Sequence, residues 1–363
     1  MTSAKAASRT TKKSGVQLSA PRDFGRFRRL LLSWYDRNRR DLPWRNTRDP
    51  YAIWLSEIML QQTRVAAVLE HYRLFLERFP DVSALAAASE DAVVAAWSGL
   101  GYYRRARMLH RCSQEIVAQH GGRFPATAAA LQDLPGIGRY TSAAIASIAF
   151  GEPVAVVDGN VERVLRRIDG RVSISARTWE RAQALLSQSR PGDFNQAMME
   201  LGATVCLPRE ARCEECPVLG LCVTQAREMR SQGSGFALLQ AASSPRQTKR
   251  HIWCSLDRRD GHVRLVRRPK NVSLMAGMWE LPQWTDASHE SVSAEEWRTF
   301  RHSITVSDYT VHVLRDWQTQ EATNKEAAAE TRASRGKWVS IKTIPQLPIT
   351  GLTRKILKAD GII

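Results

Sequence analysis

The sequence predicts an all-α domain followed by a smaller α+β domain, and three observations lead to this fold class. From about Asp23 to Gln225, apolar residues recur at the spacing of amphipathic helices, and no segment there alternates clearly as a strand would. A stretch rich in glycine and serine then reads as a linker. Beyond it, short apolar segments flank turn residues. The expected organisation is a disordered basic tail (1–22), a helical domain (23–225), a linker (226–250) and a second domain (251–363).

The first helices can be assigned from their apolar positions. An opening helix is expected where apolar residues recur at helical spacing, at Phe24, Phe27, Leu30, Leu31, Trp34 and Tyr35. The next should begin at Asp49-Pro50, because a capping side chain is followed by a residue whose missing N–H costs nothing at that position. A further amphipathic helix is predicted over Val65–Leu76.

The second domain is expected to contain strands. His251–Leu256 and Val263–Val266 flank Asp260-Gly261, which predicts a β-hairpin. Thr310–Trp317 and Lys337–Ile341 are predicted to be further strands. Strands mixed with helical segments indicate an α+β unit.

The charge balance predicts a polyanionic partner. Lys and Arg number 53 against 36 Asp and Glu, which gives a net charge of +17. Phosphate contacts supply most non-specific affinity for DNA, although an acidic membrane surface would satisfy the same arithmetic. No apolar run approaches the roughly 20 residues that span a bilayer, and the first 22 residues lack the apolar core of a signal peptide. We therefore expect no membrane partner.

A glycine-rich turn could bind a phosphate. In Leu134-Pro-Gly-Ile-Gly-Arg-Tyr140, Gly136 and Gly138 allow a tight turn that exposes backbone N–H groups at the start of a helix. A plain helix–turn–helix corner is the alternative. The phosphate-binding interpretation gains weight because an acidic residue, Asp158, follows about twenty positions later.

Four of the six cysteines form a cluster with the spacing C-x6-C-x2-C-x5-C, namely Cys206, Cys213, Cys216 and Cys222. Without a secretory signal, this clustering favours a metal site over a disulfide framework. Four thiolates could hold zinc or a 4Fe–4S cluster, and the spacing alone does not decide between them. Cys112 and Cys254 are expected to be ordinary buried thiols.

A single carboxylate lies within an apolar helix, at Glu57 in the segment Trp54–Thr63. A surface position is the usual fate of glutamate, but the neighbouring residues leave little polar face around it. Desolvation would favour its protonated form, as a general acid requires. The amides of Gln61 and Gln62 could reach base edges or fill a vacated stack.

Together, the glycine-rich hairpin, the downstream aspartate and the cysteine loop resemble the endonuclease III superfamily of DNA glycosylases. Four further segments resemble the MutY-type adenine DNA glycosylases within it: Leu42–Arg45, Trp54–Thr63, Gly99–Arg107 and Val156–Leu165. The resemblance implies a helix-hairpin-helix glycosylase domain with an iron–sulfur cluster loop, followed by a smaller Nudix-like domain. It also implies one 4Fe–4S cluster, and double-stranded DNA containing A:8-oxoguanine or A:G mispairs as partner.

The family resemblance also implies roles for individual residues. Glu57 would protonate the adenine that is flipped out of the duplex, and Asp158 would stabilise the charge that develops on the sugar. Tyr140 and Asn160 would position these groups. The four clustered cysteines would ligate the metal cluster. The residues expected to contact DNA are Arg45, Gln61, Gln62, Thr63, Tyr102, Gly136, Gly138 and Thr305.

Among these, Tyr102 and the adjoining Tyr103 could instead be core aromatics, but Arg104, Arg105 and Arg107 follow them, and basic residues beside aromatic ones suit a nucleic-acid surface. Asn160 could also serve as a helix cap.

The second domain resembles the Nudix-like module of this family through Leu274–Pro282, but no acidic, metal-binding Nudix box follows, so we do not expect pyrophosphate hydrolysis. Many relatives carry Phe-Ser-His a short way after an Arg-His pair. Here Arg301-His302-Ser303 is followed by Ile304-Thr305-Val306, so the histidine is missing. Thr305 keeps a hydroxyl, and the departure bears on how strongly the lesion is discriminated.

Two rival functions stay open at this stage. The first is an endonuclease III-like glycosylase and lyase, which would carry a lysine where this chain has Tyr140. The second is a non-catalytic, metal-stabilised DNA-binding protein. We favour a monofunctional glycosylase that uses water, and expect a monomer located in a bacterial cytoplasm and associated with the nucleoid.

Overall fold

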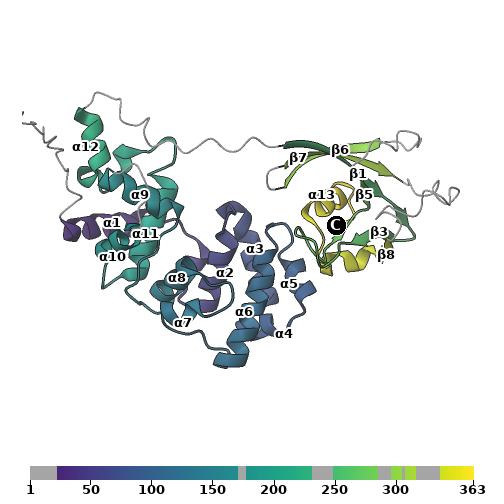
Figure 1. The fold of residues 1–363 in the computed structure, drawn as a ribbon, viewed down its shortest axis with the longest axis horizontal. Coiled ribbons are helices and arrows are strands. Elements are labelled where there is room, and N and C mark those ends of the chain that lie inside the picture. Colours follow the sequence, from purple (N-terminus) through teal and green to yellow (C-terminus); the bar gives the residue numbers. More distant parts are fainter. Residues whose placement is uncertain (1–22, 171–176, 231–247, 285–295, 305–306, 316–335) are drawn as a thin grey trace, which may run out of the picture. The chain divides into compact units, whose positions relative to one another are not determined.

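The computed structural model describes residues 23–170, 177–230, 248–284, 296–304, 307–315 and 336–363 (Figure 1). The expected tail (1–22) therefore lies outside the described residues. The chain divides into two compact units, one formed by residues 1–40 and 153–241 and the other by residues 41–152 and 242–363. Within the described residues, no helix is long and apolar enough to cross a membrane.

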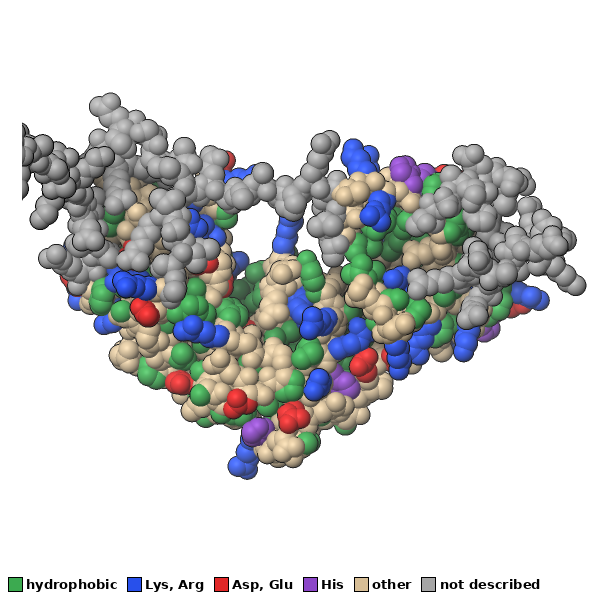
Figure 2. Space-filling model, viewed as in Figure 1, with side chains coloured by type: hydrophobic (Ala, Val, Ile, Leu, Met, Phe, Trp, Pro, Cys, Tyr) green, Lys and Arg blue, Asp and Glu red, His purple; other side chains and the backbone are tan. Residues whose placement is uncertain are grey.

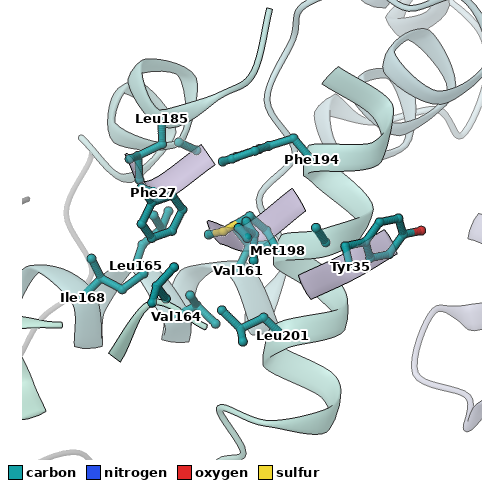
Figure 3. Packing of buried hydrophobic residues seen from close by; sticks show 14 of the residues in the cluster. Phe27, Tyr35, Val161, Val164, Leu165, Ile168, Leu185, Phe194, Met198 and Leu201 are labelled. Atoms are coloured by element: carbon teal, nitrogen blue, oxygen red, sulfur yellow. The ribbon is translucent and has the colours of Figure 1, made fainter. Parts of the chain in front are cut away.

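The first unit is helical where it is described. Its helices are α1 (Phe24–Asn38), α9 (Gly159–Asp169), α10 (Thr178–Leu185), α11 (Pro191–Thr204) and α12 (Val223–Arg230). The predicted opening helix is confirmed as α1, with Asp23 as its cap. Apolar side chains of α1, α9 and α11 form one core, in which Phe27, Val161 and Met198 are almost completely buried (Figure 3). This core joins the N-terminal helix to segments more than 100 residues away.

The helical part of the second unit contains α2 (Pro50–Leu60), α3 (Val65–Arg78), α4 (Val82–Ala87), α5 (Glu90–Ala96), α6 (Arg104–His120), α7 (Ala128–Gln132) and α8 (Arg139–Ala149). The predicted starts of α2 and α3 are confirmed, and the side chain of Asp49 accepts a hydrogen bond from the backbone of Tyr51. Helix α2 is buried from Tyr51 to Met59. It packs against α8, α3 and α6, so that its residues are surrounded by other helices.

The same unit contains the strands β1 (Thr248–Leu256), β2 (Arg258–Arg259), β3 (His262–Arg267), β4 (Trp279–Glu280), β5 (Gln283–Trp284), β6 (Glu296–Ile304), β7 (Ser307–Arg315) and β8 (Lys337–Ser340), and the helix α13 (Gly351–Ala359). One sheet has the order β5-β1-β7-β6, with β1 and β7 parallel. In the other, β3 pairs with β2, β4 and β8. The strands predicted around 310–317 and 337–341 correspond to β7 and β8, although Trp317 lies outside the described residues.

The predicted hairpin needs a correction. Asp260 and Gly261 do form a tight turn with positive φ angles of 46° and 73°, which suits a two-residue hairpin turn. The turn, however, connects β3 to the two-residue strand β2, and β1 belongs to the other sheet. A one-residue break after Leu256 separates β1 from β2, so the segment around His251–Leu256 pairs with β7 instead.

The ends of the predicted linker lie in regular elements, because α12 continues to Arg230 and β1 begins at Thr248. The rest of the linker lies outside the described residues. On the face drawn in Figure 2, lysine and arginine side chains are spread over both units and are not gathered in a single patch.

Candidate active site

Glu57 lies in the buried part of α2, where only 6% of it is exposed. The hydroxyl of Tyr140, at the start of α8, donates a hydrogen bond of 2.6 Å to its Oε2. The packing of α2 against α8 brings these two residues together. The expectation that Glu57 is removed from the surface is therefore confirmed, and Tyr140 supplies a polar partner to it.

Asp158 caps the N-terminus of α9. Its Oδ1 accepts a hydrogen bond of 2.7 Å from the backbone of Val161, and its Oδ2 accepts one of 3.0 Å from the side chain of Asn160. These two hydrogen bonds fix the orientation of the carboxyl group at the start of α9. The alternative that Asn160 caps the helix is wrong, since Asp158 occupies that position and Asn160 binds the capping carboxylate.

Arg163 connects Asn160, the partner of Asp158, to the cysteine loop. Its Nη2 donates to Oδ1 of Asn160 at 2.8 Å and to the carbonyl of Gly202 at 2.7 Å, while its Nε donates to the carbonyl of Cys206 at 2.9 Å. A side chain at Gly202 would not fit, because a Cβ there would lie 2.6 Å from Cβ of Asn160. Arg163 was not among the residues predicted from the sequence, although its position three residues after Asn160 places both on the same helical face.

The structure thus brings together Glu57 with Tyr140, and Asp158 with Asn160. The first pair belongs to the unit formed by 41–152 and 242–363, and the second to the unit formed by 1–40 and 153–241.

Two turns beside α2 contain four of the residues expected to contact DNA, namely Gln61, Gln62, Thr63 and Tyr102. Gln62 and Tyr102 both have left-handed backbone conformations, with φ angles of 55° and 47°. Residues other than glycine seldom adopt such conformations. Tyr102 is 53% exposed. Both residues line one cavity of about 890 Å³, together with Gln61 and Gly136. Such a cavity with an exposed ring and amide groups could receive a base.

Arg105 holds these two turns together. Its Nη1 donates to the carbonyls of Ile58, Met59 and Gln61, and its Nη2 donates to the Thr63 hydroxyl and to the carbonyls of Leu100 and Gly101. The guanidinium also lies over the rings of Trp97 and Tyr102. Desolvation lowers the pKa of Arg105 to about 10, which reflects how far it is removed from water.

The prediction that Arg104, Arg105 and Arg107 form one basic surface is therefore wrong for two of them. Arg105 points inward, and Arg107 pairs with Glu90 at 3.0 Å and binds the carbonyl of Ala276. The tyrosine pair is also divided, since Tyr103 is buried in the core whereas Tyr102 is exposed. A local pattern of basic and aromatic residues does not reveal which side of the turn each residue occupies.

The glycine-rich turn has the expected form. Gly136 has a φ angle of 79°, and a Cβ there would lie 3.0 Å from Cβ of Met108. Gly138 caps α8 with ordinary backbone angles, and a Cβ there would meet nothing within 4 Å. Protein packing therefore explains Gly136 but not Gly138, whose lack of a side chain leaves the N-terminus of α8 accessible to a ligand.

The structure says less about Arg45 and Thr305, the other two residues predicted to contact DNA. Arg45 ends a short 3₁₀ turn (Pro43–Arg45) and is half-buried. Thr305 lies outside the described residues, as does Val306.

The four clustered cysteines line one cavity, together with apolar residues such as Val164 and Leu201. All four are free thiols. Nη1 of Arg167 lies 3.2 Å from Sγ of Cys206, and burial raises the pKa of Cys216 to about 12. Among the described residues, no three His, Cys, Asp or Glu side chains are placed closely enough to hold a single metal ion. The number and kind of donors nevertheless fit a cluster bound by four thiolates. A cationic centre would offset the cost of burying these thiolates.

Comparisons with known proteins agree with this architecture. Residues 55–187 match the family model of the HhH-GPD superfamily of base excision DNA repair proteins, and residues 252–359 match the NUDIX domain model. The expected fold class, a helical helix-hairpin-helix glycosylase domain with a Nudix-like α+β domain, is thereby confirmed.

Among curated proteins, the chain is 35% identical to the adenine DNA glycosylase of Mus musculus, in a match that covers 93% of this chain and 78% of the mouse protein. It is 40% identical to the adenine DNA glycosylase of Homo sapiens, over 71% of this chain and 57% of the human protein. Among solved structures, a thermostable thymine-DNA glycosylase is 32% identical with a TM-score of 0.54, over 56% of this chain and 97% of that one.

Proposed function

From the premise that this chain belongs to the family of adenine DNA glycosylases, we propose that it excises adenine mispaired with 8-oxoguanine or guanine. The reaction would hydrolyse the N-glycosidic bond and leave the DNA strand intact. The observation that carries this proposal is the buried carboxyl group of Glu57, held by the hydroxyl of Tyr140 at 2.6 Å.

Glu57 would act as the general acid. Transfer of its proton to a ring nitrogen of the extruded adenine allows the base to leave with the electron pair of the glycosidic bond. Burial within α2 favours the neutral acid, and Tyr140 fixes the orientation of the carboxyl group.

Asp158 would oppose the positive charge that develops on the sugar as the bond breaks. The hydrogen bonds from Asn160 and from the backbone of Val161 hold this carboxylate in one orientation. Water then completes the hydrolysis at the sugar carbon.

Tyr140 also supports the monofunctional reaction over the lyase alternative. A Schiff-base mechanism needs an amine at the position that follows the glycine-rich turn, and this chain has a tyrosine there whose hydroxyl is engaged by Glu57. A lyase would cut the strand without alkali, which provides a direct test.

We further propose that Cys206, Cys213, Cys216 and Cys222 hold one 4Fe–4S cluster. When bound, such a group supplies cross-links within the loop and positive charge near the thiolates. Arg167 would stabilise the thiolate of Cys206 through its hydrogen bond. The purified protein should absorb broadly near 400 nm by the expectation for clusters with four thiolate ligands, and a colourless protein containing zinc would contradict this assignment.

The oligomeric state, the location and the DNA contacts of the protein are proposed on the same premise. The protein would act as a monomer on the nucleoid in a bacterial cytoplasm. Gly136 and Gly138 would receive a phosphate, while Gln62 and Tyr102 would enter the duplex beside the opposing base. Arg45, Gln61 and Thr63 would contact or support the same DNA segment, and Thr305 would approach the oxidised guanine.

A single-turnover strand-cleavage assay tests this function. Duplexes would contain A opposite 8-oxoguanine, G or T. A further duplex with T opposite G tests thymine, the base in the name of the similar thymine-DNA glycosylase. We expect alkali-dependent cleavage at A in the first two duplexes and none in the others. Cleavage without alkali would favour the lyase. Cleavage only at T would show that the substrate is mispaired thymine and not adenine. Binding without any cleavage would favour the non-catalytic alternative.

A further inference from the structure

Left-handed backbone conformations are concentrated at one cavity. Among the described residues, four positions other than glycine have positive φ angles, and three of them, Gln62, Tyr102 and Met275, line the cavity of about 890 Å³. The fourth, Asp260, forms a hairpin turn. Such conformations cost about 1 kcal/mol or more and persist when surrounding contacts enforce them, often where a ligand binds. Gln62 and Tyr102 already have a proposed role toward the base opposite adenine, whereas Met275 has none.

The turn around Met275 presents apolar side chains from the C-terminal domain. Leu274, next to Met275, is 45% exposed, and both residues line the same cavity as Tyr102. Neither side chain has a polar group that requires water. An exposed leucine in a turn is not stabilised by its own burial, so the structure must hold it there by other means.

Two arginines bind backbone carbonyls of this turn. Nε of Arg268 donates to the carbonyl of Leu274 at 3.1 Å, and Arg268 is itself paired with the buried Glu280 at 2.7 Å. Arg107 of α6 binds the carbonyl of Ala276 and also pairs with Glu90. The turn is therefore ordered before any ligand binds, which reduces the entropy lost on binding.

We propose that Leu274 and Met275 form an apolar wall against the face of the base opposite the target adenine, and that they help to determine specificity for a purine there. This inference rests on the proposed function. A purine has a flat apolar face and polar edges, and the cavity offers complementary surfaces: the side chains of Leu274 and Met275, the ring of Tyr102 and the amide of Gln62. In a duplex with an abasic site opposite adenine, Leu274 and Met275 would have no base to contact.

The test compares binding and single-turnover excision for three duplexes, in which A lies opposite 8-oxoguanine, opposite G, or opposite an abasic site. The variants are Leu274→Ala and Met275→Gly. Glycine adopts the φ angle of Met275 without strain, so the second variant removes the side chain while keeping the turn. Leu74→Ala is the matched control, since Leu74 is 48% exposed, against 45% for Leu274, and does not line this cavity.

We expect both variants to bind the two purine-containing duplexes about fivefold to tenfold more weakly, the loss expected for one apolar contact. Their affinity for the abasic duplex should match that of the wild type and of Leu74→Ala. Equal losses on all three duplexes, or no loss on any, would overturn the inference while leaving the proposed function intact. If the wild-type protein released no adenine from any duplex, the proposed function would fail and this inference with it.

Discussion

Two opposing effects act on the carboxyl group of Glu57. Burial disfavours its charged form, whereas the hydrogen bond donated by Tyr140 favours it. The balance can shift when adenine enters, because the base excludes the remaining water and offers a nitrogen that accepts the proton. In the proposed mechanism, Tyr140 therefore positions the carboxyl group of Glu57 without itself transferring the proton.

Glu57→Gln should retain binding to mispaired DNA and lose excision by a factor of about 10² to 10⁴, the usual contribution of a general acid. Tyr140→Phe should lose about tenfold, corresponding to one hydrogen bond of roughly 1.4 kcal/mol. Fluorescence anisotropy and single-turnover rates would measure the two effects separately. Near-normal excision by Glu57→Gln would remove this residue from the acid role.

His302 gives the C-terminal domain a dependence on pH. Burial, with a smaller contribution from Lys355, lowers the pKa of His302 below its ordinary value of 6.5. Between that lowered pKa and 6.5, the unfolded chain binds a proton that the folded chain does not. The stabilisation is therefore complete above pH 6.5 and is lost as the pH falls through the folded pKa.

His302→Asn should remove this part of the acid sensitivity. We expect the difference in Tm between pH 7.5 and pH 5 to be smaller in the variant than in the wild type. His262→Asn is the control, because His262 is an exposed histidine. Identical pH profiles for the wild type and His302→Asn would show that His302 does not control this dependence.

The two turns that carry Gln62 and Tyr102 depend on one side chain from the first turns of α6. Arg105 forms six hydrogen bonds to them, five of which are to backbone carbonyls. Hydrogen bonds to a charged group contribute more than neutral ones, and their loss would leave carbonyls without donors. The left-handed conformations of Gln62 and Tyr102 would then lose their main support.

Arg105→Gln should lower the free energy of unfolding by about 2–4 kcal/mol. At a temperature where it is fully folded, it should also excise mispaired adenine more slowly, because Gln62 and Tyr102, which we propose to enter the duplex, are no longer fixed. Arg104→Gln, at the exposed neighbouring position, should change stability by less than about 0.5 kcal/mol. Chemical denaturation and single-turnover kinetics would check both expectations. Equal behaviour of the two variants would contradict the role given to Arg105.

Local sequence signals predicted the helix starts and one turn well, because each depends on a few adjacent residues. Asp49 and Pro50 act through a side-chain cap and a missing N–H, and Asp260-Gly261 acts through its preference for positive φ. The partner of β1 could not be predicted in this way, since β7 lies more than 50 residues further along the chain. The sequence also could not predict that the side chain of Arg105 points into the protein, because this depends on which backbone carbonyls the fold leaves without hydrogen-bond donors.

The division of the chain into two units also could not be predicted from the spacing of apolar residues. Helix α1 packs with α11 and α10, at the far end of the helical region, while Glu57 and Asp158 fall in different units. An amphipathic pattern reveals that a helix has a buried face but not which helix covers it. Roles could be assigned to Glu57 and Asp158 only because the motifs around them resemble a family. Arg163 lies within one of those motifs, but its link between Asn160 and the cysteine loop depends on contacts that the sequence does not show.

The net charge of +17 leads to a prediction for DNA binding as a whole. If about six to ten phosphates are neutralised, affinity should fall by about 10³ to 10⁵ between 50 and 200 mM salt. Because phosphates carry no sequence information, mispaired and fully matched duplexes should weaken by similar factors. The excision rate at saturating protein should change little, since Glu57 is buried and its partner Tyr140 is half-buried. Dissociation constants for both duplexes across a salt series would measure this, and a fall of less than tenfold would show that the basic residues distributed over the surface do not carry the binding.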